Sequence, residues 1–314
     1  MKSLAKLKKI KGDASFREFY RNRENKSIIV ISKKEKLKNL LIYDAINKIL
    51  IKNKILAPNL LSENYINNYI EINDFGDQTL FQILKNKKNN KYVIFKKIIK
   101  ILNKIQLIKD KKVKNFKNKL YKVQEYNNKI LIDETKLFCD WYAPNKLSKF
   151  KSIKFKKKFK SEVKNLLSKL NYKNDTFVHR DFHVSNLMYH NKKIAVIDSQ
   201  DALIGNRAYD LASLIDDVRL KTSNELKDKV FKFYIKTNKK IDLKKFKKDF
   251  EILSVLRNLK IIGIFMRLAA RDKKKKYLKL IPYAWELINH RIKEQNEFNN
   301  LILLLKNNFP KFIR

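Results

Sequence analysis

The spacing of apolar residues changes once along this chain, and that change limits the folds it can adopt. In the first 75 residues, side chains alternate over residues 15–20, and residues 26–32 form a β-branched run. Alternation with a period of two is typical of half-buried strands. Further on, the apolar spacing becomes that of helices. The sequence therefore predicts an α+β protein with a small β-rich part, residues 1–75, and a larger, mainly helical part, residues 76–314.

The same pattern predicts individual elements. The clearest helix carries isoleucines at positions 94, 98, 101, 105 and 108, which form one continuous apolar stripe. Lysine- and asparagine-rich runs at residues 85–91 and 110–119 are expected to be solvated loops. The other expected elements are two strands within residues 15–32, a helix over 35–53, strands over 60–66 and 69–73, a helix over 159–170, short strands at 177–178 and 194–197, and helices from about residue 209.

The charge balance is strongly basic, with 74 lysines and arginines against 31 acidic residues and a formal net charge of +43. Such a balance raises nucleic acid or an anionic membrane as a partner. Here the lysines are spread from Lys2 to Lys311, and no stripe of arginine and aromatic residues accompanies them. We therefore interpret them as a solvated surface rather than a specific nucleic-acid site.

The chain is expected to work in the cytoplasm. Cys139 is the only cysteine, so neither an intramolecular disulfide nor a cysteine-based metal site is expected. The N-terminal segment has charge but lacks the apolar run of a signal peptide. No uncharged stretch is long enough to insert into a bilayer. A monomer is expected.

A polar motif of fixed spacing interrupts the helical part. Residues 179–186 read His-Arg-Asp-Phe-His-Val-Ser-Asn, which matches the pattern H-R-D-x-x-x-x-N of phosphoryl-transfer loops. Twelve residues after Asn186, the apolar run 194–197 ends in Asp198. An alternative is that these polar residues only satisfy a buried turn. That alternative explains neither the spacing nor the second strand that ends in an aspartate.

These residue types suit phosphoryl transfer from ATP to a hydroxyl group. The barrier falls mainly through alignment of the hydroxyl with the γ-phosphate and neutralisation of phosphate charge. Asp181 is the predicted catalytic base, because a carboxylate accepts the acceptor proton. Asn186 and Asp198 offer hard oxygen ligands and are the predicted Mg²⁺ ligands.

Three nearby features are given lesser roles. His179 and His183 have the spacing of zinc ligands, but no soft third ligand follows, so both are expected to hold the loop. Asp74-Phe75-Gly76 resembles a kinase metal motif but precedes the loop by about a hundred residues, so we interpret it as a turn between two lobes. No Ala-Pro-Glu follows Asp198, which argues against a protein substrate.

Together these motifs resemble the aminoglycoside phosphotransferase and choline kinase superfamily. The matching positions are His179 to His183, Asn186 to Met188, Ile197-Asp198, Gln200-Asp201-Ala202, Gly205 and Tyr209-Asp210-Leu211. Within it, the chain is most similar to bacterial kinases that phosphorylate the anomeric hydroxyl of N-acetylmuramate and N-acetylglucosamine. Similarity extends from Gly12 to Pro282.

The resemblance implies a protein-kinase-like two-lobed fold, ATP and Mg²⁺ as cofactors, and a role in peptidoglycan recycling. It also implies that Ser15, Phe16 and Arg17 lie in a nucleotide phosphate loop. Lys33 is either the phosphate lysine of the wider superfamily or part of the lysine-rich surface. Ser199 is a departure, because it stands where the sugar kinases carry an aromatic residue beside the metal aspartate.

Acceptor residues are predicted from side-chain chemistry. Asp140 and Trp141 form an acidic and aromatic pair that suits a sugar, although helix packing explains them equally well. Arg267 suits a substrate carboxylate, or else a structural ion pair. His183 is included as a second-choice substrate contact. The residues expected to support the loop are His179, Asp201 and Asp210.

Other functions remain open at this level. One is a kinase for choline, homoserine or an aminoglycoside, although the chain is poor in acidic residues outside the loop region for binding an aminoglycoside's ammonium groups. A non-catalytic nucleotide-binding relative is disfavoured by intact Asp181, Asn186 and Asp198. A lysine-rich RNA-binding relative is the remaining alternative.

Overall fold

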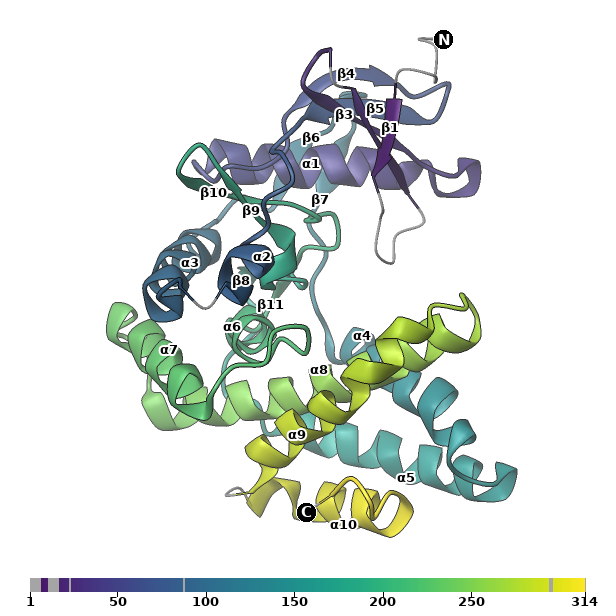
Figure 1. Ribbon diagram of the computed structural model, residues 1–314. Helices are drawn as coiled ribbons and strands as arrows, with labels where there is room; N and C mark the ends of the chain where they lie inside the picture. The colour runs from purple at the N-terminus through teal and green to yellow at the C-terminus, as the bar shows by residue number, and fades with distance from the viewer. Residues whose placement is uncertain (1–6, 11–16, 23, 87, 294–295, 314) are drawn as a thin grey trace. The chain divides into compact units, whose positions relative to one another are not determined.

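The structure is a computed structural model that describes residues 7–10, 17–22, 24–86, 88–293 and 296–313. The chain forms two compact units (Figure 1). The first comprises the described residues up to Gln124 together with Thr176–Ile204, and the second comprises Glu125–Asp175 and the residues from Gly205 onward. The predicted lobe boundary near residue 75 falls inside the first unit, and the division into lobes 1–75 and 76–314 stays a prediction.

The first unit contains a five-stranded antiparallel sheet in the order β1-β2-β3-β5-β4. Each strand pairs with a neighbour close in sequence, except that β3 pairs directly with β5. The predicted strands of residues 15–32, 60–66 and 69–73 correspond to four of these five. The strands are β1 Leu7–Ile10, β2 Glu18–Asn22, β3 Ser27–Ile31, β4 Leu60–Asn64 and β5 Tyr69–Asn73.

Helix α1, Lys38–Lys52, covers one face of this sheet (Figure 1). Ile28 and Val30 alternate along β3 and pack with Leu40 and Tyr43 of the helix. These side chains are at most 7% exposed. The helix predicted over residues 35–53 is confirmed, because its apolar residues recur at the spacing that places them on one face.

The rest of the first unit carries two helices and five short strands. Thr79 caps α2 through a reciprocal capping box with Gln82. A run expected to be a loop, residues 110–119, instead begins a β-hairpin, because Asn115 bonds the backbone of its turn and Asn118 adopts a positive φ. The elements are α2 Leu80–Lys85, α3 Lys91–Gln106, β6 Lys112–Lys114, β7 Leu120–Lys122, β8 Thr176–Val178, β9 Leu187–His190 and β10 Lys193–Val196.

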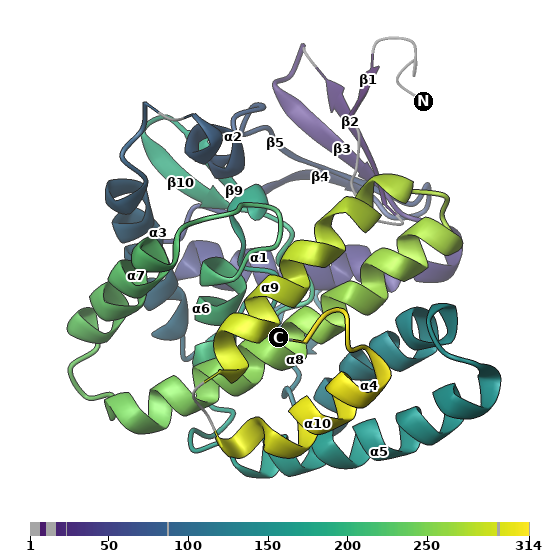
Figure 2. The ribbon, with the colours of Figure 1, turned by 60° about the horizontal axis from the view of Figure 1, so that its bottom comes forward.

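The second unit is helical (Figure 2). Its longest helix, α8, runs alongside α9 and also contacts α4 and α6. Strand β11, Leu203–Gly205, pairs with β8, and its first two residues belong, like β8, to the first unit. The helices of the second unit are α4 Asn128–Leu137, the π-helix η3 Phe138–Tyr142, α5 Lys149–Ser168, α6 Ala208–Ile215, α7 Asn224–Thr237, α8 Leu243–Ala270, α9 Ile281–Ile292 and α10 Asn299–Asn308.

The contact between α8 and η3 depends on a glycine. A Cβ atom at Gly263 would lie 2.3 Å from the carbonyl carbon of Leu137 and 2.5 Å from the backbone nitrogen of Phe138. Any side chain would therefore separate the two helices. Phe138, at the start of η3, is fully buried and its ring packs against Tyr142, Phe159 and other aromatic rings.

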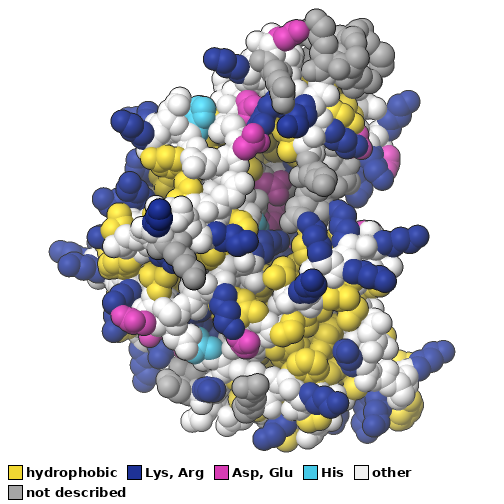
Figure 3. All heavy atoms as spheres, viewed as in Figure 1, with side chains coloured by type: hydrophobic (Ala, Val, Ile, Leu, Met, Phe, Trp, Pro, Cys, Tyr) yellow, Lys and Arg dark blue, Asp and Glu magenta, His cyan; other side chains and the backbone are white. Residues whose placement is uncertain are grey.

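Surface charge is distributed as the sequence suggests. Lysine and arginine side chains are scattered over the face seen in Figure 3, on many different elements. Within the described residues, none of the helices combines the length and the apolar character that a membrane-spanning segment needs.

One cluster of charges is instead buried in the second unit. Asp216 is fully buried and accepts hydrogen bonds from Arg291 at 2.8 and 3.0 Å, from Lys227 at 3.2 Å and from Ser254 at 2.6 Å. Burial by itself would raise the pKa of this carboxyl group, but the charges of Arg291 and Lys227 outweigh it and hold the pKa of Asp216 well below its usual range. The cluster links α6 to α7, α8 and α9.

Replacing Asp216 by asparagine is expected to destabilise the protein by roughly 3–5 kcal/mol, because two buried cations would lose their counter-charge. Urea unfolding at pH 7 followed by circular dichroism measures this loss. Asp228→Asn, at an exposed position on α7, is the control and should change the free energy of unfolding by no more than about 0.5 kcal/mol. Equal effects of the two substitutions would contradict the role given to the cluster.

Candidate functional site

The segment of residues 179–186, named here the HRD loop, lies between strands β8 and β9. The end of β8 is apolar, and Phe177 and Val178 are fully buried. Within the HRD loop, Phe182 and Val184 are also fully buried. These buried side chains anchor the loop in the core, and the anchoring fixes the positions of its polar residues.

Hydrogen bonds within the HRD loop position its two predicted functional residues. The backbone carbonyl of Asp181 accepts from the backbone nitrogen of His183 at 3.0 Å and from the side-chain nitrogen of Asn186 at 3.0 Å. The amide group of Asn186 is thereby oriented, since its nitrogen is used and its oxygen is left pointing elsewhere. Asp181 itself is half-buried.

A backbone hydrogen bond brings Asp198 to the same place. The nitrogen of Ile197 donates to the carbonyl oxygen of Asn186 at 3.0 Å. Strands β9 and β10 form an antiparallel hairpin in which Val196 faces Leu187. The backbone of Asp198, two residues after Val196, therefore lies near that of Asn186, the residue before Leu187. The pairing places the backbones of the two residues near each other, and their convergence on a metal stays a prediction.

Two residues of this region have backbone angles that side chains seldom adopt. Arg180 has a φ of 74° and Asp198 a φ of 63°. Such conformations cost free energy in residues other than glycine and tend to occur where the surroundings impose them, often at functional sites. Here Arg180 precedes the predicted catalytic base in the HRD loop, and Asp198, two residues after the end of β10, is itself a predicted metal ligand.

Asp198 is bound by an arginine that lies just before strand β2. The Nη2 atom of Arg17 lies 2.7 Å from Oδ1 of Asp198, and its Nη1 atom donates to Oε1 of Gln200 at 2.9 Å. The side chain of Arg17 is 3% exposed, whereas that of Asp198 is 39% exposed. The aspartate is therefore held from its buried side and remains accessible from the other.

Ser199 makes a second link between this segment and the N-terminal elements. Its hydroxyl donates to Oδ1 of Asn47 at 2.7 Å, and both residues are buried. Asn47 lies on α1. The sequence departure noted at Ser199 thus corresponds to a buried hydrogen bond in place of aromatic packing.

His179 is fully buried at the start of the HRD loop. Its Nε2 atom lies 3.1 Å from the carbonyl oxygen of Ile197. Since a carbonyl oxygen only accepts, Nε2 carries the hydrogen. Burial lowers the pKa of His179, although the nearby carboxylates of Asp181 and Asp198 act in the opposite direction. The neutral ring therefore ties the start of the loop to the end of β10.

The predicted nucleotide-binding residues are only partly described. Ser15 and Phe16 lie outside the described residues. Arg17 contacts Asp198 and Gln200, as above. Lys33 is exposed at the start of a short 3-10 helix, Lys34–Lys36, and no ion pair joins it to another described residue. The nucleotide role of these residues stays a prediction.

The predicted acceptor residues Asp140, Trp141 and Arg267 lie in the second unit. Asp140 forms ion pairs with Lys156 at 2.5 Å and with Lys136 at 3.9 Å. Trp141 follows it in η3 and is half-buried. The Nε atom of Arg267 is buried without a hydrogen-bond partner in the described part of the chain, and burial together with Arg271 lowers the pKa of this guanidinium.

The remaining predicted residues, His183, Asp201 and Asp210, are buried or contact neighbouring side chains. His183 is 6% exposed. Asp201 accepts from the side chain of Gln200 at 2.9 Å and lies 3.9 Å from Arg180, so it connects the segment after β10 to the HRD loop. Asp210 is fully buried on the first turn of α6. Their supporting roles stay predictions.

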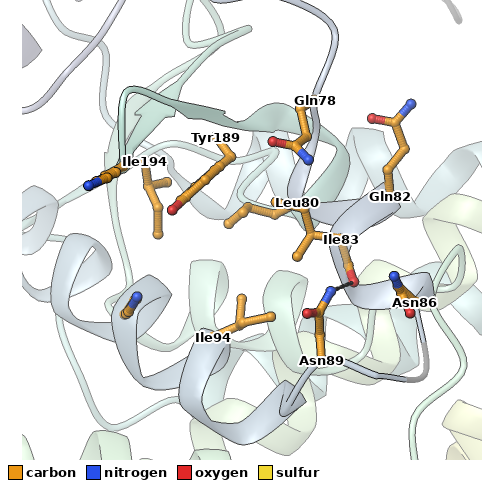
Figure 4. Close-up of a pocket in the computed structure, with 11 residues that line it drawn as sticks. Gln78, Leu80, Gln82, Ile83, Asn86, Asn89, Ile94, Tyr189 and Ile194 are labelled. Carbon is orange, nitrogen blue, oxygen red and sulfur yellow. Dashed lines mark hydrogen bonds between the residues drawn. The ribbon is translucent and has the colours of Figure 1, made fainter.

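A separate pocket of about 440 Å³ lies in the first unit, away from the predicted catalytic residues (Figure 4). It is bounded by α2, α3 and the β9–β10 hairpin. Leu80, Ile83, Ile94 and Tyr189 point into it, and Asn89 on its rim bonds the carbonyl of Ile83. None of Asp181, Asn186 and Asp198 lines it.

Two contributors to the site were not identified from the sequence. Asn47 looked like a polar residue on a helix, and Gln200 was noted only as part of a motif. Their partners lie 152 and 183 positions away in the sequence. No local sequence pattern indicates such a pairing. The one available signal was that Asp44 and Asn47 are polar residues on the otherwise apolar, buried face of α1.

Comparisons with known proteins agree with this geometry. Residues 6–240 match the model of the family described as "Phosphotransferase enzyme family". Since this is well over half of the chain, the protein belongs to the phosphotransferase enzyme family.

Particular relatives are sugar kinases. Over 166 residues the chain is 35% identical to the N-acetylmuramate/N-acetylglucosamine kinase of Neisseria meningitidis, an alignment that covers 50% of this chain and 49% of that protein. The chain thus aligns with only about half of that relative's length. It is 26% identical to the enzyme of the same name from Pseudomonas aeruginosa, over 96% of this chain and 88% of that protein.

A solved structure shows the same fold. It is a choline/ethanolamine kinase family protein from Mesorhizobium loti, with a TM-score of 0.64, 11% identity and coverage of 96% of this chain and 92% of that one. The two-lobed, kinase-like α+β fold predicted from the sequence is thereby confirmed.

The buried state of His179 predicts a pH dependence of stability. Its pKa in the folded protein lies below the ordinary value, so on acidification the unfolded chain takes up this proton first. The stability that depends on a neutral His179 is therefore fully present above about pH 6.5. As the pH falls further, the free energy of unfolding decreases by up to about 1.4 kcal/mol for each pH unit. Urea unfolding at pH 7.5, 6.5 and 5.5 measures the slope.

In His179→Asn this slope should be smaller, whatever the overall loss of stability. His190→Asn, on the partly exposed end of β9, is the matched control and should keep the slope of the unsubstituted protein. An unchanged slope in His179→Asn would show that the histidine is not held neutral.

Proposed function

We propose that this protein is an ATP- and Mg²⁺-dependent sugar kinase that phosphorylates the anomeric hydroxyl of N-acetylmuramate and N-acetylglucosamine. The observation that carries the proposal is the hydrogen bond from Ile197 to Asn186, combined with that from Asn186 to the Asp181 carbonyl. These two bonds bring together a carboxylate for the acceptor and two oxygen donors for a metal. The names of the relatives supply the sugar.

The donor set fits magnesium. Asn186 contributes an amide oxygen, because its nitrogen is already bonded, and Asp198 contributes a half-exposed carboxylate. Mg²⁺ is commonly bound by one or two such oxygen ligands, with phosphates and water completing its shell. When bound, the ion neutralises charge on the phosphate oxygens. A cysteine or histidine cage is not needed for this chemistry.

Asp181 is proposed to act on the acceptor. Its carboxylate orients the sugar hydroxyl and takes its proton as the oxygen forms a bond to the γ-phosphorus. The bond from that phosphorus to the bridging β–γ oxygen breaks, and ADP leaves with the bonding electrons. The backbone of Asp181 is held by His183 and Asn186, so the side chain starts from a fixed position.

The acceptor residues are proposed to lie along α8 and η3. Lys260 pairs with Glu134 at 2.9 Å, and Gly263 meets Leu137 and Phe138, so the two segments run in one register. We propose that Arg267 and Trp141, one turn further along the two segments, both face the acceptor. An aromatic face and a cation whose buried Nε has no hydrogen-bond partner among the described residues suit a sugar that carries a carboxylate, as N-acetylmuramate does.

The wider context is proposed from the same relatives. The reaction belongs to the recycling of cell-wall sugars, and we propose that the protein acts in the cytoplasm as a monomer. The nucleotide-covering lobe is proposed to be residues 1–75 and the substrate-bearing lobe residues 76–314.

Asp181→Ala is expected to reduce kcat by roughly 10²–10⁴-fold, as for loss of a general base, and to leave nucleotide affinity within about two-fold. A coupled assay for ADP formation and a fluorescent-nucleotide titration measure the two quantities. Asp133→Ala removes an exposed carboxylate on α4 and should behave as the unsubstituted enzyme. Retention of full turnover in Asp181→Ala would remove this residue from the mechanism.

Acceptor choice is tested with the purified protein, ATP and four compounds: N-acetylmuramate, N-acetylglucosamine, choline and kanamycin. We expect ADP formation with the two amino sugars and none above background with the other two, because choline lacks a sugar ring and kanamycin requires an acidic pocket. Chemical reduction of the anomeric carbon to the sugar alcohol should abolish acceptance. Turnover of choline or kanamycin alone would replace this proposal with the corresponding alternative.

A further inference from the structure

Asp198 has an unusual support for a metal ligand. Its backbone adopts a positive φ of 63°, a conformation that a non-glycine residue leaves unless its surroundings hold it. One side of the carboxylate is open, with 39% of the side chain exposed, and the other side meets the guanidinium of Arg17 at 2.7 Å. The conformation of this ligand therefore depends on what binds its buried side.

Arg17 is itself fixed in a single position. Its Nη1 and Nη2 atoms donate to Gln200 and Asp198, two residues on the same turn after β10. Its guanidinium also lies 5.3 Å from the ring centre of Tyr43 and 5.6 Å from that of Phe19, which are favourable distances for a cation beside an aromatic ring. Burial raises the pKa of Tyr43 to about 12, so this neighbour adds no negative charge.

The guanidinium of Arg17 bonds the residues before and after Ser199, and Ser199 itself has a different partner. While Arg17 grips the residues on either side, the Ser199 hydroxyl donates to Asn47 of α1 at 2.7 Å. Three consecutive residues, Asp198, Ser199 and Gln200, are thus tied to Arg17, just before β2, and to Asn47 of α1 by three side-chain hydrogen bonds. An isolated ion pair would not produce this arrangement, because only a planar guanidinium bonds two acceptors at fixed directions.

From this geometry we infer that Arg17 is a positioning residue for the metal ligand Asp198. The inference rests on the proposed function, and it gives Arg17 a role other than the predicted nucleotide contact. Groups that orient a metal ligand typically change metal affinity by about 10–100-fold when they are removed. The guanidinium holds one carboxylate oxygen and leaves the other free for the ion.

The test measures divalent-ion binding directly, without an acceptor. Mn²⁺ is titrated into the protein with a non-hydrolysable ATP analogue and followed by electron paramagnetic resonance. Arg17→Met is expected to weaken Mn²⁺ binding by roughly ten-fold or more. Arg17→Lys should be intermediate, because a lysine retains the charge near Asp198 but cannot bond Gln200 at the same time.

Arg21→Met is the matched control. Arg21 lies on β2, four residues after Arg17, and forms comparable ion pairs, with Asp74 and Asp77 at 3.0 and 2.7 Å, and among the described residues no hydrogen bond joins it to the segment after β10. Its substitution should leave Mn²⁺ affinity within about two-fold of the unsubstituted protein. Circular dichroism confirms folding, and if Arg17→Met does not fold, Arg17→Lys against Arg21→Lys makes the same comparison.

The other outcomes overturn the inference in distinct ways. Unchanged Mn²⁺ affinity in Arg17→Met would exclude a positioning role, and equal losses in Arg17→Met and Arg21→Met would mean general damage to the sheet. A loss of metal-free nucleotide affinity with normal Mn²⁺ affinity would restore the predicted nucleotide contact. If the unsubstituted protein bound no Mn²⁺ with the nucleotide analogue, the proposed kinase function itself would fail.

Discussion

The backbone hydrogen bond between Ile197 and Asn186 is the constraint on which the candidate site depends. It joins the end of one short strand to the end of a loop, and it is fixed because the β9–β10 hairpin sets the register on one side and buried apolar side chains anchor the loop on the other. A shift of one residue would turn Asp198 to the opposite face. The proposed convergence of three polar side chains therefore depends on strand register.

Polar residues in this protein act mainly where water is excluded. On the surface, lysines are numerous and individually of little consequence, since exposed ion pairs contribute little to stability. In the interior, buried charges are paired: Asp216 binds two cations in the second unit, and in the first unit the buried Arg17 binds Asp198, whose other side stays exposed. The high net charge of the chain thus says little about its chemistry, whereas the few buried ions hold helices and loops in defined positions.

Two of the residues with unfavourable backbone angles lie at the candidate site. Arg180 and Asp198 both have positive φ angles, and each is held by side chains from elsewhere in the unit. The link from Arg17 and Asn47 makes the N-terminal sheet and α1 part of the support for the candidate metal site. Ser199 is central to that link, because a small hydroxyl can bond Asn47 where an aromatic ring could only pack.

The sequence by itself determined the elements with a strong local period and the motif with fixed spacing. Helices α1 and α3, strands β4 and β5, and the HRD loop were all predictable, because apolar periodicity and short-range polar spacing are local properties. Strand β1 and the β6–β7 hairpin were missed, because each of these short strands contains lysine and only one or two apolar residues. Only the tertiary structure decided that Arg17 bonds Asp198 and that Asn47 bonds Ser199. Those partners are 181 and 152 residues apart, and pairing over such distances follows from how the sheet and helix pack, which no local pattern encodes.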